Sequence, residues 1–432
     1  MTNLEKAKRP EKPGSLERRS DAPTTLTLEL KVVTFIQGGG ISWSEDDLTK
    51  HVKHIDPVTP IRGSAIRGHL RFWWRATHGC KAESIKAMRE RESKLWGSSS
   101  QAGLVSLKVQ GKPGVSEVAL YKNVAAKTSG KFNPKPAAGH ETIAYAGIGV
   151  QPKGGQTQQP SDGVVTKVDG AVSLTLSFDA LTTKEERTQV LDALQAWRLF
   201  GGLGGRTRRG YGTIAIGETT DFRHKAPTEF LEGFTSKNTL RLVPSLHNAS
   251  CRLNPKATTA ERAWKAAIGA LQSFRQGPGV GRNPGQSRPG RSRWPEPDEV
   301  RRLTGTNDQQ HKPEHVVRKF PRARFGMPII FHFQSRDDPK DTTLKPANYE
   351  RMASPLIVKA VATSDGYCPL ALVLTVPGAD DVALVLNANP RDHKVNASLT
   401  DAEAEKFSPM GGRGADPLQA FLNFFSESQG TR

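Results

Sequence analysis

Residues 59–75 read TPIRGSAIRGHLRFWWR, and this stretch carries a row of arginines beside a row of apolar side chains. Arg67, Arg71 and Arg75 lie four residues apart, so on an α-helix each side chain is turned by only about 40° from the one before it, and the three form one ridge. The side chains on the neighbouring face are those of Ile66, Leu70, Trp73 and Thr77. The pattern predicts a helix over residues 64–78 whose apolar face packs on a sheet.

Alternation of apolar and polar residues predicts strands on both sides of this helix. The expected strands are 25–36, 104–109, 171–181 and 213–216, and a second helix is expected at 182–200. Thr182 or Thr183 caps the second helix, and Glu185 and Glu186 favour its N-terminal end. Residues 25–217 therefore follow the order strand, helix, strand, insertion, strand, helix, loop, strand, which is the βαββαβ order of the ferredoxin-like fold.

The composition changes between residues 112 and 169, where Gly, Pro, Gln, Lys and Ser are frequent and periodicity is weak. We predict a long and partly mobile insertion there, with short strands at 119–124 and 142–150. Residues 1–23 mix both charge signs with proline, which predicts a disordered tail.

The second half of the chain predicts a further α+β unit. Its expected strands are 240–246, 327–333 and 369–376, and its expected helices are 257–274 and 418–425. The sequence thus predicts an α+β protein with two ferredoxin-like domains and a boundary near 218–236. The first domain covers residues 24–217 with the insertion 112–169, and the second, more decorated one covers 218–432.

The charge balance favours a polyanionic partner. There are 62 Lys and Arg residues against 43 Asp and Glu, a formal charge of +19, and the sequence pI is about 9.9. Nucleic acid fits this field better than a membrane, because no apolar run approaches the ~18 residues of a span and no long basic amphipathic helix is evident. Three scattered cysteines disfavour a disulfide scaffold or a zinc finger, and the N-terminus lacks an apolar signal core, so we expect a cytoplasmic protein.

The arginine ridge, defined as Arg67, Arg71 and Arg75, is the first candidate RNA contact. Like charges four residues apart on a helix repel each other, so the spacing indicates that an anion lies along the ridge. The helix N-terminus next to Arg62 could also receive a phosphate. Trp73 is expected in the core, whereas Trp74 lies nearer the ridge and is equally compatible with stacking on a base. A solvated basic face over buried tryptophans is the alternative.

The second candidate is the glycine-rich loop, residues 200–212, which reads FGGLGGRTRRGYG. Its glycines would let the backbone approach a ligand closely, its guanidinium groups would bind phosphate, and its tyrosine ring would stack on a base. The residues expected to contact RNA are Gly204, Gly205, Arg206, Arg208, Arg209 and Tyr211. The loop is not a Walker A motif because the terminal Gly-Lys-Ser/Thr is missing. A plain glycine-rich turn is the alternative.

The third candidate is the arginine-rich segment, residues 275–324, which holds 12 Lys and Arg against 5 Asp and Glu. It is compatible both with a flexible RNA-contacting loop and with a disordered, solvated one. The arginines that would contact RNA are Arg275, Arg282, Arg288, Arg291 and Arg293.

A catalytic centre is harder to find. The pairs His51/His54 and His311/His315 have metal-like spacing, but neither has a nearby Cys or an HExxH pattern, so we expect no metal site and no cofactor. His69 or His54 could act as a general acid or base on RNA, although a lone histidine is more often structural. A P-loop and a Gly-x-Ser-x-Gly motif are absent. We therefore expect no catalytic residues.

Several of these segments resemble one known family, the head subunit of the type III-B CRISPR (Cmr) effector complex. The most specific is TPIRGSAIRGHLRFWWRA, while the glycine-rich loop resembles that of the wider RAMP superfamily. Similar stretches are RSRWPEPDEVRRL (291–303), PRARFGMPIIFHF (321–333) and ERMASPLIVK (350–359). The resemblance implies two RRM-related domains without a nuclease centre, a place near the 3′ end of the guide RNA, and contact with other RAMP subunits. It also implies that RNA is contacted by Arg62, Arg67, Arg71, Arg75, Arg206, Arg208 and Arg209. The insertion has no clear counterpart in the family.

We therefore expect a non-catalytic RNA-binding structural subunit of an antiviral type III-B effector complex. Its expected partners are guide RNA (crRNA), target RNA and other RAMP subunits, with no membrane. A guide-processing RAMP endoribonuclease is the alternative, because such enzymes share the fold plan and the glycine-rich loop. A DNA-binding protein is a third hypothesis, which a comparison of RNA and DNA affinity would test.

Overall fold

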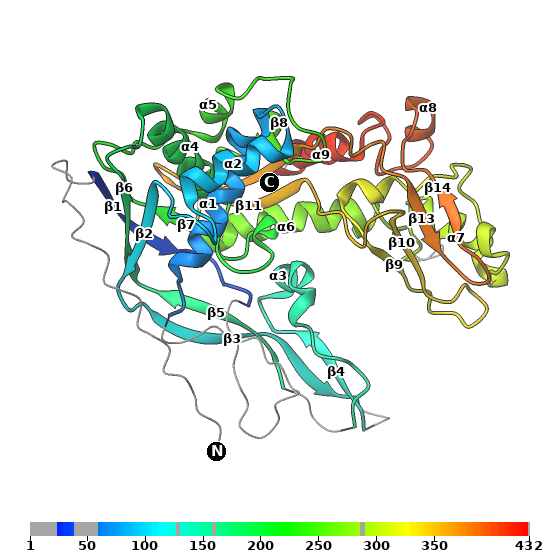
Figure 1. The fold of residues 1–432 in the computed structure, drawn as a ribbon. Helices are drawn as coiled ribbons and strands as arrows, with labels where there is room; N and C mark the ends of the chain where they lie inside the picture. Colours follow the sequence, from blue (N-terminus) through cyan, green and yellow to red (C-terminus); the bar gives the residue numbers. More distant parts are fainter. Residues whose placement is uncertain (1–23, 39–58, 127–129, 158–160, 286–289, 431–432) are drawn as a thin grey trace, which may run out of the picture.

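The computed structural model describes residues 24–38, 59–126, 130–157, 161–285 and 290–430 (Figure 1). Helices and antiparallel sheets are interspersed along the chain, so the predicted α+β class is confirmed. The expected tail at 1–23, both residues of the His51/His54 pair, and Arg288 lie outside the described residues.

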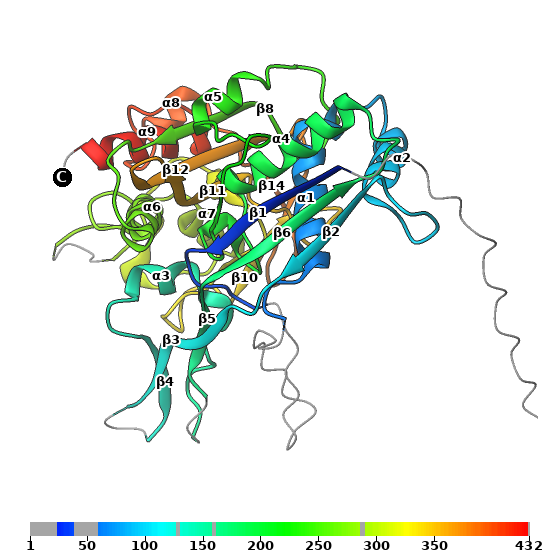
Figure 2. The same cartoon turned by 90° about the vertical axis from the view of Figure 1, so that its left-hand side faces the viewer.

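The first sheet forms from strands that are far apart in sequence. Its strands are β1 (Thr24–Val32), β2 (Val105–Gln110), β6 (Ala171–Phe178) and β7 (Ile214–Ile216), in the spatial order β2-β6-β1-β7. Burial alternates along β1, so that Leu26, Leu28 and Leu30 face the core while the residues between them are exposed. With α1 (Gly63–Thr77) and α4 (Lys184–Phe200), the chain order is the predicted βαββαβ (Figure 2).

The two helices of this unit form where their sequences predict. On α1, Leu70 and Trp73 are buried against the sheet. On α4, the Thr183 hydroxyl accepts from the Glu186 backbone N–H and the Glu186 carboxylate accepts from the Thr183 N–H, a capping box that satisfies both groups. A further helix, α2 (Ile85–Trp96), follows α1 and was not predicted. Its N-cap Ser84 accepts from the Ala87 N–H.

The insertion is an ordered unit among its described residues, not the weakly structured loop that was predicted. It forms the sheet β4-β3-β5 and a short helix, with the elements β3 (Gly114–Ala125), β4 (Phe132–Pro136), α3 (Glu141–Ala146), η2 (Ile148–Val150) and β5 (Gly163–Asp169). The strand expected at 119–124 lies within β3, but 142–150 is helical. Strands β3 and β4 extend away from the body of the molecule (Figure 1), while Ile143 and Ala144 of α3 are buried in a core with residues of α6 (Ala260–Gln276).

The second half builds a smaller sheet than predicted. Its elements are α5 (Pro227–Glu232), β8 (Ser245–Leu253), α6 (Ala260–Gln276), β11 (Leu356–Thr363), β12 (Gly366–Thr375) and α9 (Pro417–Gly430). The sheet order is β11-β12-β8, three strands among the described residues where a complete ferredoxin-like sheet has four. The strand expected at 240–246 begins only at Ser245, because Leu242 has a positive φ of 59° and Pro244 has no N–H for a ladder.

A satellite sheet decorates this second half. It consists of β9 (Ile329–Phe331), β10 (Thr342–Pro346), β13 (Leu384–Asn387) and β14 (His393–Val395), with α7 (Glu296–Thr304) beside it and α8 (Asp401–Ala404) further along. Phe320, Leu344 and Leu386 form part of its own apolar core. The predicted strand at 327–333 therefore exists, but it belongs to this satellite sheet.

The two halves share one hydrophobic core. Leu28 and Leu176 of the first sheet are in the same buried cluster as Val361 and Leu372 of the second sheet. At this seam between the halves, α1 and α4 of the first unit contact β8 and β11 of the second.

Candidate nucleic-acid interface

The arginine ridge forms on α1, but much of its charge is already neutralised. Glu92 of α2 is buried, and its Oε1 lies 2.6 Å from Arg71 Nε and 3.3 Å from Arg75 Nη1. Arg67 is exposed, and so is Arg62 before the helix. For Arg71 and Arg75, the anion beside the ridge is therefore the Glu92 carboxylate of the same chain.

Trp74 does not lie on the surface, so the stacking role considered for it is wrong. Its side chain is buried, and its indole N–H donates to Gln189 Oε1 at 2.9 Å. Trp73 is also buried, as expected. Both indoles serve the packing of α1 against α4.

In the glycine-rich loop, the backbone approaches other parts of the chain. Gly204 has a φ of 78°, and a Cβ there would lie 2.5 Å from Ile36 Cγ2. The Gly205 N–H donates to the Gln37 carbonyl at 2.7 Å. The loop backbone does approach another group closely, as predicted, but that group is the segment after β1. This contact within the chain accounts for the two glycines, and no ligand is needed to explain them.

Arg208 and Arg209 join the two halves of the molecule. The Arg208 guanidinium donates to the Ser354 carbonyl, and Arg209 Nη1 donates to the Leu356 carbonyl at 2.7 Å. Burial lowers the pKa of Arg208 from its ordinary value and that of Arg209 to about 10. These arginines are largely used in holding the loop against β11, so they are not the freely available phosphate contacts that were predicted.

Tyr211 is also a structural residue, and the expected base-stacking role is wrong. Its ring is fully buried, edge-on to Trp264 with centroids 4.7 Å apart, and its hydroxyl donates to the Ile143 carbonyl at 2.9 Å. Burial raises its pKa above the ordinary value. The ring fastens the glycine-rich loop to α3 of the insertion.

A basic cleft of about 800 Å³ lies where the glycine-rich loop, the insertion, α6 and the satellite sheet meet. Its arginines are Arg206, Arg209, Arg275, Arg282, Arg291, Arg301 and Arg322. Only two carboxylates, those of Asp298 and Asp338, are among its lining residues. The fold thus brings the second and third sequence candidates into one site, which the arginine ridge does not share. Arg293 lies outside this lining and contacts Ser408 Oγ at 3.0 Å.

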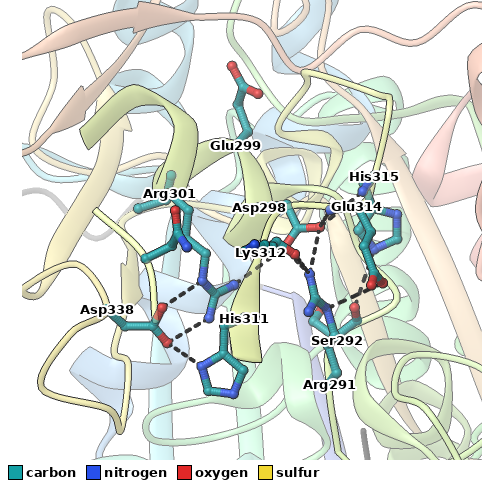
Figure 3. Close-up of polar contacts among 12 residues, drawn as sticks. Arg291, Ser292, Asp298, Glu299, Arg301, His311, Lys312, Glu314, His315 and Asp338 are labelled. Atoms are coloured by element: carbon teal, nitrogen blue, oxygen red, sulfur yellow. Dashed lines mark hydrogen bonds and ion pairs between the residues drawn. The ribbon is translucent and has the colours of Figure 1, made fainter. Parts of the chain in front are cut away.

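Part of the cleft is a buried ion-pair network (Figure 3). The Arg301 guanidinium donates two hydrogen bonds of 2.8 Å to the Asp338 carboxylate. The Asp298 carboxylate lies 2.9 Å from Arg291 and 3.3 Å from Arg301. Burial alone would raise the pKa of Asp338, but Arg301 reverses this and the pKa lies below its usual value. Arg322 Nε forms an ion pair with Oε2 of the buried Glu296 at 3.2 Å, and the Arg322 backbone N–H donates to Glu296 Oε1 at 2.7 Å.

Besides Arg209, whose guanidinium is bound to Leu356 and Ser354, three arginines of the cleft have no carboxylate partner among the described residues. Arg206 donates to the Ala146 carbonyl at 3.1 Å, and Arg282 donates to the Gly290 carbonyl at 3.3 Å. Arg275 lies over the Phe325 ring at 5.9 Å. Their positive charges are not neutralised by an ion pair, so these are the side chains best placed to bind an anion in the cleft.

His311 and His315 do not form a shared site. His311 Nδ1 lies 2.8 Å from Asp338 Oδ2, whereas His315 Nε2 is 3.3 Å from the Ser292 carbonyl, so the i, i+4 pair has separate partners. His69 stacks on Trp197, and burial lowers its pKa. Within the described ranges, no group of three or more His, Cys, Asp or Glu side chains is arranged to hold a metal ion.

The ion-pair network was missed by reasoning from sequence, although part of its signal was present. Asp298 and Arg301, and likewise Glu299 and Arg302, are three residues apart on α7 and pair along the helix. This i, i+3 spacing is typical of helix ion pairs and could have been recognised. The partner Asp338 is 37 residues from Arg301, and no local pattern points to it.

Comparisons with known proteins agree with the motifs of the first half. A family model described as the RAMP superfamily matches residues 29–215. The RAMP resemblance is confirmed over this segment. No curated protein sequence matches the chain. Among the described residues, no helix has the length and apolar character needed to cross a bilayer.

Solved structures that match the chain include Cmr1, a chain of a Cmr-beta complex and Cmr6. Cmr1 from Pyrococcus furiosus is 12% identical, with a TM-score of 0.41 over 82% of this chain and 88% of that one. A chain of a type III-B Cmr-beta complex bound to cognate target RNA is 10% identical, with a TM-score of 0.45 over 95% of this chain and 100% of that one. Cmr6 from Pyrococcus furiosus is 12% identical, with a TM-score of 0.24 over 46% of this chain and 100% of that one.

Proposed function

We propose that this chain is a non-catalytic, RNA-binding subunit of a type III-B CRISPR effector complex and acts in the cytoplasm. The observation that carries the proposal is the basic cleft, in which Arg206 from the first half and Arg275 and Arg282 from the second half converge. The sequence resemblance to the Cmr head subunit supports the type of complex, and the RAMP match over residues 29–215 supports the superfamily. Its partners in that role are guide RNA near the 3′ end, target RNA and other RAMP subunits.

The chemistry of the cleft suits phosphate binding without strong sequence preference. Guanidinium groups form charge-assisted hydrogen bonds to phosphate oxygens, which fix the position of a strand and carry no base information. The buried ion pairs of Arg291 with Asp298 and of Arg301 with Asp338 connect α7 to the loops of the cleft beside these three arginines. Contacts that order part of a binding surface in advance reduce the conformational entropy lost when RNA binds.

The direct test measures RNA affinity of the full chain against salt, with Arg206, Arg275 and Arg282 changed to Ala together. We expect weaker binding and a salt slope that is smaller by about 2, since each lost phosphate contact on a single strand removes about 0.7. Arg241→Ala is the matched control, because Arg241 pairs with Asp381 on an exposed surface outside the cleft. An unchanged slope in a triple variant that melts like the wild type would refute the proposal.

The non-catalytic part of the proposal needs its own measurement. A labelled RNA incubated with the chain should remain intact both with and without divalent metal. Cutting at a defined position without metal would favour the endoribonuclease alternative. Within the described residues, His69 is a poor candidate for such a reaction because its ring stacks on the buried Trp197 and burial lowers its pKa.

A further inference from the structure

We infer that the basic cleft takes RNA as a single strand, with unstacked bases lying against Ile148 and Ile330. This rests on the proposed RNA-binding function and adds which form of RNA the site accepts. The inference comes from apolar side chains at the cleft that phosphate binding does not explain.

Two of the most exposed large apolar side chains of the described structure line this one cleft. Ile148, in η2 of the insertion, is 56% exposed, and Ile330, in β9 of the satellite sheet, is 66% exposed. In Figure 1, α3, the helix just before η2, lies in the insertion, whereas β9 lies in the satellite sheet, a separate part of the molecule. Exposed isoleucines are unremarkable singly, but two in a site rich in arginine indicate a ligand with both anionic and apolar surfaces.

Partly buried aromatic rings extend both apolar walls. Tyr145 of α3 lies near Ile148 in sequence, and Phe333 follows Ile330, and both rings line the cleft. The Arg301 guanidinium lies over the Phe333 ring at 4.8 Å, which fixes that side chain beside the ion-pair network. The cleft thus combines cations with two apolar walls, the arrangement used by sites that bind single strands through backbone charge and base faces.

A duplex does not match this combination. Its bases are stacked on each other and paired, so the isoleucines would meet sugars, phosphates and base edges but no base face. The volume of about 800 Å³ also lies within the range of roughly 300–1,000 Å³ of small-ligand clefts, which suits a few nucleotides rather than a length of helix. A protein segment would find apolar contacts, but seven arginines against two carboxylates favour a polyanion.

The experiment compares three probes on the full chain at one salt concentration. They are a short labelled RNA of mixed sequence, the same strand annealed to its complement, and a strand of equal length made of abasic units. The protein variants are Ile148→Ser with Ile330→Ser, and Leu181→Ser as the control, because Leu181 is 61% exposed and lies outside the cleft. Both isoleucines are on the surface, so the double variant should keep the wild-type melting temperature.

We expect the wild type to bind the single strand more tightly than either the duplex or the abasic strand. The double variant should lose roughly five- to tenfold affinity for the single strand and bind the abasic strand like the wild type. Equal binding of all three probes, or a double variant that binds like Leu181→Ser, would overturn the inference. If the triple arginine variant still weakens binding in that case, the cleft binds RNA and only the inferred preference for single strands is wrong. If the triple arginine variant also has no effect, the proposed RNA-binding function is itself wrong.

Discussion

Arg67 and Arg71 are one turn apart on α1, but their surroundings give them different roles. Arg71 Nε lies 2.6 Å from a Glu92 carboxylate that is only 2% exposed. A buried carboxylate depends on its partners, since an unpaired charge in the interior is costly. The sequence pattern predicts that Arg67 and Arg71 both contact RNA, and the Glu92 contact changes that expectation for Arg71.

Arg71→Ala should therefore act on stability more than on RNA affinity. We expect the free energy of unfolding to fall by roughly 1–3 kcal/mol, because Glu92 loses its shortest partner and keeps only the longer contact to Arg75. Chemical denaturation measures this change, and Arg67→Ala is the matched control because Arg67 is exposed. If Arg71→Ala melts like the control while RNA binding drops, the arginine ridge is an RNA contact after all.

At the scale of elements, α3 shows how the insertion is fastened to the body. This helix has only six residues, Glu141–Ala146, so most of its carbonyl groups lack a partner within the helix, although the Ala144 carbonyl accepts from the N–H of the C-cap Gly147 at 2.8 Å. Tyr121 of β3 donates to the Ala144 carbonyl at 2.5 Å, and Tyr211 of the glycine-rich loop donates to the Ile143 carbonyl at 2.9 Å. Two buried hydroxyl groups thus satisfy the helix end and connect three elements.

Tyr211→Phe tests this fastening because it removes one hydroxyl group and keeps the ring against Trp264. We expect a loss of about 1–2 kcal/mol in stability, since the Ile143 carbonyl is left buried without its donor. Hydrogen exchange should show faster opening of α3, with little change in the first sheet. Exchange that rises equally in all elements would show that Tyr211 supports the whole fold instead of this one contact.

At the scale of the whole molecule, a buried lysine lies on the seam between the halves. Lys359 of β11 is fully buried, and its Nζ donates to the Gly201 carbonyl at the end of α4, at 2.5 Å. Burial, with a smaller effect from Arg198, lowers the pKa of Lys359 to about 7. The folded state therefore disfavours the charged form of the Lys359 amine.

This makes stability depend on pH in a defined direction. Between pH 7 and about 10.5 the unfolded chain keeps the lysine proton while the folded chain releases it, so the free energy of unfolding should rise with pH, by up to about 1.4 kcal/mol per pH unit. Below pH 7 both states are protonated and the contribution is constant. Denaturant unfolding of the wild type and Lys359→Met across this range gives the difference due to the lysine. A difference that does not change with pH would mean that the amine titrates normally in the fold.

Much of the fold followed from short-range patterns in the sequence. The apolar periodicity of α1, the capping box of α4 and the alternation in β1 each depend on residues within a few positions of one another, and all three formed as predicted. The insertion was predicted poorly because its order depends on contacts with α6 and the glycine-rich loop, which are remote in sequence.

The sequence by itself therefore determined the α+β class, the βαββαβ order of the first sheet and the three arginine-rich segments. The tertiary structure decided which arginines are available to a ligand. Arg71 meets Glu92 across 21 positions, Arg208 meets Ser354 across 146, and Trp74 meets Gln189 across 115. Charge and ring type can be read from the chain, but neutralisation and burial depend on partners that only folding brings within hydrogen-bond distance.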